Sequence, residues 1–354
     1  MIQREDKRFE TSPSLLPVAA GEPIDPRVLI LAGGDGLRLR PLVRELTGED
    51  RPKQFAAIVG GESLLAQTRR RAALLVAPEQ TQIILTRQHA PYFQGILSGA
   101  SAPSFLIQPQ NRGTATAVLY ALLRDARRRP SGPVVVLPSD HWVSDDAAFM
   151  AHVGLALAAV EARPDLIVLL GIAPTRPEPG YGWIEPSEPI FEQSTNLRAV
   201  RSFVEKPSLE VAALLQSQGF LWNSFVVIGQ VQSLLLLFAL ALPELMNSFL
   251  PVWNALGSSS ELAAIERLYR DLPDADFSRD VLARQPEMLA VLPVTGLSWD
   301  DLGDPARVLA IREKTASSAS PYRPGTLREA KDLPWSIPTR GRFLAARGVA
   351  VPCR

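Results

Sequence analysis

The chain of 354 residues carries 37 basic and 37 acidic side chains and therefore has no formal net charge. This balance, with a hydrophobic content of 46%, is typical of a globular protein and does not favour a nucleic-acid-binding protein, which usually has a basic excess. The one cysteine, Cys353, excludes an intrachain disulfide. The charged start of the chain, MIQREDKRFE, contains no apolar signal segment, so we expect a cytoplasmic location and neither a membrane nor a nucleic acid as partner.

Short buried strands alternate with helices through the first half of the chain. After an irregular N-terminal arm, 1–26, the pattern of apolar residues predicts strands at 28–31, 82–86, 104–108, 134–137 and 166–170. Helices are predicted between them, at 62–76, 114–128 and 147–161. The alternation predicts a doubly wound α/β fold with a mostly parallel sheet, whose ligands bind at the carboxyl ends of the strands.

The second half of the chain has a different pattern. Strands are predicted at 181–185, 200–204 and 223–228, and helices at 209–216, 231–242, 261–269 and 305–314. The apolar stretch 225–242 is long enough to suggest a membrane span, but glycine and glutamine interrupt it, so a strand followed by a buried helix explains it better. From residue 316 the sequence loses its periodicity and predicts a poorly ordered tail.

The first predicted strand ends in the glycine loop AGGDG, residues 32–36. Glycines allow the backbone N–H groups to approach a bound anion, and Arg38, Arg40, Arg51 and Lys53 follow closely. This loop is neither a P-loop, because it lacks the required lysine, nor a dinucleotide fingerprint, because leucine stands at the last glycine position. The pattern indicates a polyphosphate ligand. The alternative is a glycine-rich turn beside a solvated basic face. Arg40 is left without a role at the site, and we expect its charge to face the solvent.

The pattern G-G-x-G-x-R-L-x-P-L followed by P-K-Q-F resembles the signature of the sugar-1-phosphate nucleotidyltransferases, and most of all that of the mannose-1-phosphate guanylyltransferases. The resemblance implies a Rossmann-like fold of the glycosyltransferase-A type. It implies transfer of a nucleotidyl group from a nucleoside triphosphate, GTP, to a sugar 1-phosphate, mannose 1-phosphate, with Mg²⁺ as cofactor. It also implies a nucleotide half at about 27–175 and a sugar-phosphate half at about 176–315, and the tail at 316–354 lies beyond the resemblance.

The nucleotide would be bound by the glycine loop, by the signature cations, and by the segment QPQNRGTA at 108–115, which resembles the family's E-P-x-x-R-N-T-A. The residues implied are Ala32, Gly33, Gly34, Gly36, Arg38, Lys53, Gln108, Arg112 and Thr114. Arg38 and Lys53 are also expected to act in catalysis by neutralising the triphosphate. Gln108 stands where the family has glutamate, and Gly113 where it has asparagine. Thr114 has an alternative interpretation as the cap of the following helix.

Two aspartates are implied as Mg²⁺ ligands. Asp140 lies in LPSDH, which resembles the family's L-P-A-D-H, and Asp301 lies in WDDLG, which resembles W-S-D-V-G. Asp140 has an alternative interpretation as a turn or helix cap, although Ser144 and Asp145 are better placed to cap the next helix. Asp301 has one as the N-cap of the helix at 305, and Asp300 replaces it as ligand if the register slips by one. We expect His141 to be structural, because magnesium prefers oxygen donors.

Three further motifs are implied to hold the sugar phosphate. They are PGYGWI, similar to G-Y-G-Y-I; VEKP, similar to F-V-E-K-P; and LWNS, similar to L-W-N-S-G. The residues implied are Gly180, Tyr181, Gly182, Glu205, Lys206 and Asn223. Glu205 would accept sugar hydroxyls, and Lys206 would pair with the sugar's phosphate during catalysis. Phe225 stands where the family has glycine, and we expect it to narrow the pocket.

Two alternatives remain open at this stage. An enzyme of the same class would use UTP, dTTP or CTP with another hexose 1-phosphate. A non-catalytic paralogue would bind the sugar nucleotide and regulate another subunit, which the full set of metal carboxylates and phosphate cations does not favour. A homo-oligomer is also left open.

Overall fold

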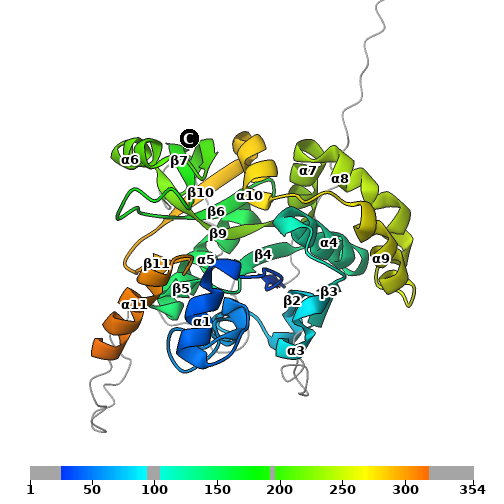
Figure 1. Ribbon diagram of the computed structural model, residues 1–354. Helices are drawn as coiled ribbons and strands as arrows, with labels where there is room; N and C mark the ends of the chain where they lie inside the picture. The colour runs from blue at the N-terminus through cyan, green and yellow to red at the C-terminus, as the bar shows by residue number, and fades with distance from the viewer. Residues whose placement is uncertain (1–24, 94–103, 192–195, 319–354) are drawn as a thin grey trace, which may run out of the picture. The chain divides into compact units, whose positions relative to one another are not determined.

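The computed structural model describes residues 25–93, 104–191 and 196–318 (Figure 1). In this part of the chain a nine-stranded sheet has the strand order β3-β2-β1-β4-β9-β6-β10-β8-β7. The strands are β1 (Arg27–Leu31), β2 (Thr81–Thr86), β3 (Ser104–Gln108), β4 (Pro133–Pro138), β6 (Ile167–Ile172), β7 (Gly182–Pro189), β8 (Arg198–Glu205), β9 (Leu221–Gln230) and β10 (Leu289–Val294). Only β8 and β9 run opposite to the other strands of this sheet, so it is mixed but mostly parallel in direction.

Helices cover both faces of the sheet (Figure 1). Leu29 of β1 points into a core formed with α4 and α7, whereas Val28 and Ile30 point into a second core formed with α2 and α5. This alternation follows from the two-residue period of a strand. The described helices are α1 (Arg40–Thr47), α2 (Leu64–Ala72), α3 (Ala90–Phe93), α4 (Gly113–Arg128), α5 (Asp146–Ala162), α6 (Leu209–Ser217), α7 (Val231–Ala241), α8 (Pro243–Ser248), α9 (Glu261–Asp271), α10 (Phe277–Asp280) and α11 (Pro305–Ser318).

The predicted doubly wound α/β fold is confirmed, with shifts at the ends of elements. The apolar stretch 225–242 is the end of β9 followed by α7. Asp145 caps α5, because its carboxylate accepts the Ala148 N–H. β10 was not predicted, although it lies inside the sheet between β6 and β8. The predicted arm, 1–26, and tail, 316–354, lie almost wholly outside the described residues.

Two features of the topology bring distant segments together. β1 and β4 are parallel neighbours, with Leu31 opposite Pro138, so the glycine loop and Asp140 emerge at the same edge of the sheet. A separate two-stranded ribbon then pairs β5 (Trp142–Val143) with β11 (Trp299–Asp300). Because this ribbon begins directly after His141 and ends directly before Asp301, it places two remote parts of the sequence at one site.

Candidate active site

A buried side chain fixes the backbone of the glycine loop by hydrogen bonds. Gln54 donates its amide N–H groups to the backbone oxygens of Ala32 and Gly34, at 3.1 and 2.6 Å. Gly36 has a φ of 60°, a conformation that favours glycine, and a Cβ atom there would also be crowded, at 3.2 Å from the backbone nitrogen of Lys53. The loop leads to Arg38, whose exposed guanidinium has no hydrogen bond or ion pair with the described residues.

Lys53 joins the two sides of the site. It begins a 3₁₀ turn, Lys53–Phe55, and its side chain is largely buried. Its ammonium group donates to the backbone oxygens of Asp301 and Leu302, at 2.5 and 3.1 Å, and lies 3.3 Å from Asp140 Oδ2. The signature lysine therefore lies between the two aspartates that the sequence proposed as metal ligands.

Asp140 follows β4, and its side chain is partly exposed. Its carboxylate contacts Lys53 and lies 3.8 Å from His141 Nε2. Burial lowers the pKa of His141 to about 4, although the charges of Asp140 and Asp301 act in the opposite direction. The neutral imidazole packs edge-on against Trp299, with ring centres 5.2 Å apart, which agrees with the structural role expected for it.

Asp301 presents its carboxylate to the same space as Asp140. Its Oδ1 accepts hydrogen bonds from the Gly303 N–H and the Tyr181 hydroxyl, at 2.8 and 3.0 Å. Burial by itself would raise the pKa of Asp301, but the charges of Lys53 and Arg307 help to bring it below its usual range. Asp301 therefore carries a negative charge at neutral pH.

The N-cap interpretation of Asp301 is wrong, and Asp300 lies away from the cavity. Asp304, rather than Asp301, caps α11, because its carboxylate accepts the N–H groups of Ala306 and Arg307. Asp300 is buried and is absent from the cavity lining; its carboxylate accepts the Leu302 N–H and contacts Arg176. Burial raises the pKa of Asp300, opposed by the charge of Arg307.

Glu205 and Gly182 belong to a second part of the cavity lining, here called the Glu205 wall, which also includes Gly180, Lys206 and Asn223. Lys206 lies 2.9 Å from Glu205 Oε1, while Glu205 Oε2 is buried without a hydrogen-bond partner among the described residues. A Cβ atom on Gly182 would lie 2.6 Å from that oxygen, so glycine makes room for the carboxylate. Burial raises the pKa of Glu205, partly offset by Lys206. Asn223 also lines this wall, where its amide donates to Ser278 at 3.4 Å.

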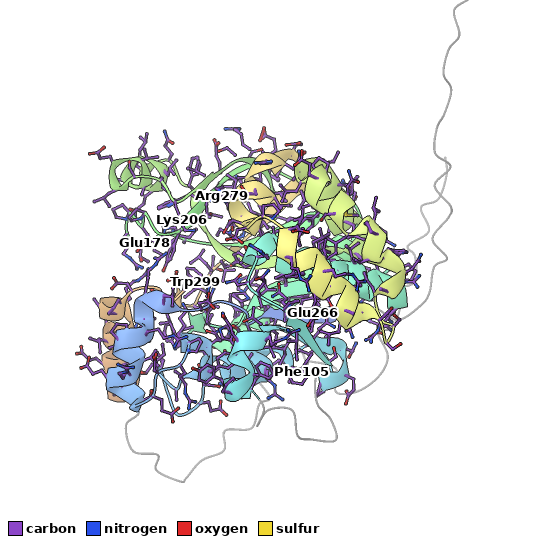
Figure 2. The ribbon with its side chains drawn as sticks, turned by 45° about the vertical axis from the view of Figure 1, so that its right-hand side comes forward. Phe105, Glu178, Lys206, Glu266, Arg279 and Trp299 are labelled. Atoms are coloured by element: carbon purple, nitrogen blue, oxygen red, sulfur yellow. The ribbon has the colours of Figure 1, made fainter. Side chains whose placement is uncertain are left out.

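Two adjoining cavities lie at the site. The larger, about 540 Å³, is lined by the end of the glycine loop, Lys53, both aspartates and the Glu205 wall. The smaller, about 320 Å³, lies between Gly33, Gly34 and Gln108. Both are lined by Thr114, Asp140, His141, Phe225 and Asp276. Figure 2 shows Lys206 and Trp299, which line the larger cavity from the end of β8 and from β11.

Two of the predicted nucleotide-binding residues lie outside the cavity lining. Ala32 is buried, with its backbone groups bonded to Ile84 and Gln54. Arg112 donates instead to the backbone oxygens of Tyr269 and Arg270, at the end of α9. The cap interpretation of Thr114 is also wrong, because its hydroxyl accepts the Phe277 N–H and α4 begins at Gly113 without a side-chain cap.

Sequence reasoning missed Asp276, which lines both cavities and also caps α10 by accepting the Arg279 N–H. Its segment is polar and lacks periodicity, and no motif of the sequence includes it, so no signal pointed to this residue. Three non-glycine residues in the described chain have positive φ: Lys206 and Phe225, which line the larger cavity, and Leu302, whose backbone oxygen accepts a hydrogen bond from Lys53. Strained backbone of this kind persists mainly where a site requires it.

The donor set of the larger cavity fits a divalent cation. Its lining includes the carboxylates of Asp35, Asp140, Glu205, Asp276 and Asp301, but only the cations Arg38, Lys53 and Lys206. The carboxylates thus exceed the cations by two, which alone would repel a polyanion. Mg²⁺ is commonly held by one or two carboxylates together with substrate phosphates, and Asp140 and Asp301 match that pattern.

The doubly wound sheet, with a glycine loop at the end of β1 and a cavity at the adjoining strand ends, defines a Rossmann-like α/β protein. The chain belongs to the nucleotidyl transferase family, whose sequence model matches residues 27–318.

Similarity to curated proteins extends over most of this chain but only part of theirs. The xanthan biosynthesis protein XanB of Xanthomonas campestris pv. campestris is 31% identical over 292 residues, covering 81% of this chain and 59% of that protein. The mannose-1-phosphate guanylyltransferase of Escherichia coli is 29% identical over 279 residues, covering 78% and 57%. The chain therefore spans just under three-fifths of the length of these relatives.

Solved structures show the same fold. The structure described as a mannose-1-phosphate geranyltransferase from Thermus thermophilus is similar with a TM-score of 0.68 and 32% identity, covering 79% of this chain and 77% of that one. A UDP-glucose pyrophosphorylase complexed with UDP-glucose has a TM-score of 0.53 at 14% identity, covering 83% and 99%, which is a likeness of fold. None of the helices in the described residues is both long and apolar enough to cross a bilayer.

Proposed function

We propose that the chain transfers a nucleotidyl group from a nucleoside triphosphate to a sugar 1-phosphate and releases pyrophosphate. The observation that carries the proposal is the convergence of Asp140 and Asp301, which extend from the same end of the antiparallel β5–β11 ribbon, on Lys53 beside the glycine loop. The family match supports the reaction class. GTP and mannose 1-phosphate, giving GDP-mannose, are the substrates we favour, because relatives named mannose-1-phosphate guanylyltransferase match most of the chain.

The reaction asks the protein mainly for positioning and charge neutralisation. An oxygen of the sugar 1-phosphate attacks the α-phosphorus in line, the bond to the β-phosphate oxygen breaks, and pyrophosphate leaves. Arg38 and Lys53 bind the triphosphate, and Lys206 holds the attacking phosphate. Bound Mg²⁺, held by Asp140 and Asp301, would neutralise charge that develops on the transferred phosphoryl group.

The sugar ring is assigned to the Glu205 wall. Glu205 Oε2 is a buried acceptor without a partner among the described residues, and a sugar hydroxyl is a suitable donor for it. The backbone at Gly180 and Gly182 lies beside it in the cavity lining. Asn223 adds a side chain that both donates and accepts.

The base of the nucleotide is assigned to the smaller cavity. The side chain of Gln108 in this cavity favours a second candidate for the nucleotide. Its Oε1 accepts the Tyr269 hydroxyl at 3.0 Å, which leaves the amide N–H groups as the remaining polar function. An amide donor suits the carbonyl of uracil or thymine as well as that of guanine. A UTP- or dTTP-dependent enzyme for another hexose 1-phosphate is therefore the alternative.

The test measures pyrophosphate release with Mg²⁺, crossing GTP, UTP, dTTP, CTP and ATP against mannose, glucose and related 1-phosphates. Turnover only with GTP and mannose 1-phosphate supports the favoured pair. Turnover with another pair keeps the reaction and changes the substrates. Binding of a sugar nucleotide without Mg²⁺-dependent turnover of any pair contradicts the enzymatic proposal and favours a regulatory paralogue. Omission of Mg²⁺ with EDTA is the control for the cofactor.

A further inference from the structure

Arg307 of α11 occupies the centre of a polar cluster behind Asp301. Its Nη2 donates to Asp301 Oδ1 at 3.0 Å. Its Nη1 donates to Glu178 Oε2 at 3.0 Å and also contacts the Tyr181 hydroxyl. The guanidinium carbon lies 5.0 Å from the centre of the Tyr181 ring. One side chain thus ties α11 to the turn before β7 and to the residue after β11.

These contacts determine which oxygen of Asp301 is available. Oδ1 accepts three hydrogen bonds, from the Gly303 N–H, the Tyr181 hydroxyl and Arg307. Oδ2 accepts none from the described residues, while Asp301 as a whole lines the larger cavity. A carboxylate that is saturated on one oxygen and free on the other has a fixed orientation. Carboxylates that bind metals are commonly fixed in this way by hydrogen bonds behind them.

Arg307 has a competing explanation, in which it balances the charge of a neighbouring carboxylate and does not orient Asp301. The adjacent Asp300 is a buried carboxylate, and Arg307 could simply balance its charge. The geometry favours Asp301: Arg307 Nε lies 3.8 Å from Asp300 Oδ1, beyond hydrogen-bond distance, and is left without a hydrogen-bond partner among the described residues. Asp300 has Arg176 at 3.4 Å as its own cation. The hydrogen bonds of Arg307 go to Glu178, Tyr181 and Asp301 instead.

We propose that Arg307 is a positioning residue that fixes the Asp301 carboxylate with Oδ2 toward the cavity and so sets the affinity of the site for its divalent cation. The proposal rests on the proposed function, because it takes Asp301 as a metal ligand. It assigns a role to a residue outside the glycine, aspartate and sugar motifs. Arg307 itself does not line the cavity, so we expect it to act through Asp301.

The test measures binding of Mn²⁺ alone by electron paramagnetic resonance, in single and double variants. Arg307→Met removes the donors but keeps a side chain of some length, and Asp300→Ser removes the charge that the competing explanation invokes. We expect R307M to weaken Mn²⁺ binding by about 10-fold or more, as loss of hydrogen bonds behind a metal ligand usually does. The same loss is expected in R307M/D300S, while D300S alone binds Mn²⁺ within about two-fold of the wild type.

The metal dependence of turnover gives a second readout. In R307M, the Mg²⁺ concentration for half-maximal activity is expected to rise while kcat at saturating Mg²⁺ largely recovers, a split that loss of folded protein would not produce. R307K is expected to regain part of the Mn²⁺ affinity, since one ammonium group replaces only some of the donors. If R307M fails to fold, R307K replaces it as the variant in which Mn²⁺ binding is measured.

Recovery of wild-type Mn²⁺ affinity in R307M/D300S would overturn the proposal, because Arg307 would then only balance Asp300. Wild-type affinity in R307M itself would also overturn it. The variant D301N separates this failure from that of the proposed function. If D301N abolishes Mn²⁺ binding and R307M does not affect it, only the role of Arg307 is wrong. If D301N binds Mn²⁺ normally, Asp301 is not a metal ligand. Both the role of Arg307 and the metal site of the proposed function are then contradicted.

Discussion

The Lys53 ammonium lies 3.3 Å from Asp140 Oδ2, so a lysine assigned to the triphosphate is paired with an aspartate assigned to the metal. Without ligands, this pairing neutralises a carboxylate in a cavity whose lining holds more acids than cations. The approach of a metal–triphosphate complex would offer each group a new partner of opposite charge. The pair therefore couples two parts of the proposed site.

The first prediction concerns this aspartate. Asp140→Asn keeps the size of the side chain but removes the charge, and we expect kcat to fall by about 10²–10³-fold because a charge-stabilising group is lost. The folded structure should persist, because Lys53 retains its bonds to the backbone oxygens of Asp301 and Leu302. Pyrophosphate release and thermal unfolding measure the two effects.

Asp145→Asn is the matched control for that variant. Asp145 lies five residues away in the sequence and caps α5, a role that asparagine also fills, so activity should not change. Near-normal turnover in D140N would remove Asp140 from the proposed metal site.

The second prediction separates the sugar phosphate from the nucleotide. Lys206→Ala removes a half-exposed ammonium group from the Glu205 wall, and we expect KM for the sugar 1-phosphate to rise by about 10–100-fold. KM for the nucleotide should change by less than about three-fold, since no nucleotide contact is assigned to this wall. Arg201→Ala, which removes an exposed cation of β8 paired with Glu185, should leave both constants unchanged. Equal effects of K206A on the KM values of both substrates would show that the assignment of Lys206 to the sugar phosphate is wrong.

Much of the fold was predictable because its signals are local. The apolar runs of β1 and β4 end in a glycine loop and in Asp140, and strand ends of a parallel sheet meet at one edge. β10 was missed, since a short apolar run that contains Pro293 has no helical or alternating period to identify it. The two-residue strands β5 and β11 are too short to be recognised at all.

The candidate site was predictable where a motif carried it and not where long-range contacts form it. Asp301 was found through its motif, but Arg307 was not, because its partners Glu178 and Tyr181 lie more than one hundred residues away in the sequence. Arg112 is the opposite case. Its motif implies a nucleotide contact, and the sequence does not indicate that its guanidinium bonds to the backbone of α9. Only tertiary contacts determine how a flexible cation is used.

The third prediction concerns the space that glycine provides beside Glu205. In Gly182→Ala, the added Cβ would lie 2.6 Å from Glu205 Oε2 and 2.9 Å from the Phe203 ring. Such overpacking is expected to lower the free energy of unfolding by about 1–3 kcal/mol and to weaken sugar 1-phosphate binding. Gly154→Ala is the control: it lies inside α5 with open space around it, so alanine should be neutral or stabilising. If G182A were as stable as G154A, the close packing of Gly182 on Glu205 would be wrong.

The last prediction concerns Phe225, which lines both cavities where they join. Its φ is 63°, a left-handed conformation that disfavours any side chain, and its ring packs edge-on against Phe277 at 6.1 Å. Both Phe225→Ala and Phe225→Gly remove the ring, but only glycine also removes the strain. We therefore expect F225G to be more stable than F225A by about 1–2 kcal/mol, measured by denaturant unfolding.

The same two variants test whether the ring limits the substrate. Because both widen the junction of the cavities to a similar extent, both should raise the kcat/KM of sugar 1-phosphates with bulky substituents, such as an N-acetyl group, relative to the unsubstituted hexose. A change of about 10-fold in that ratio is expected from the removal of a steric wall. Broadened selectivity in F225G alone would trace the effect to backbone relaxation rather than to the ring, and an unchanged ratio in both would show that Phe225 does not face the sugar.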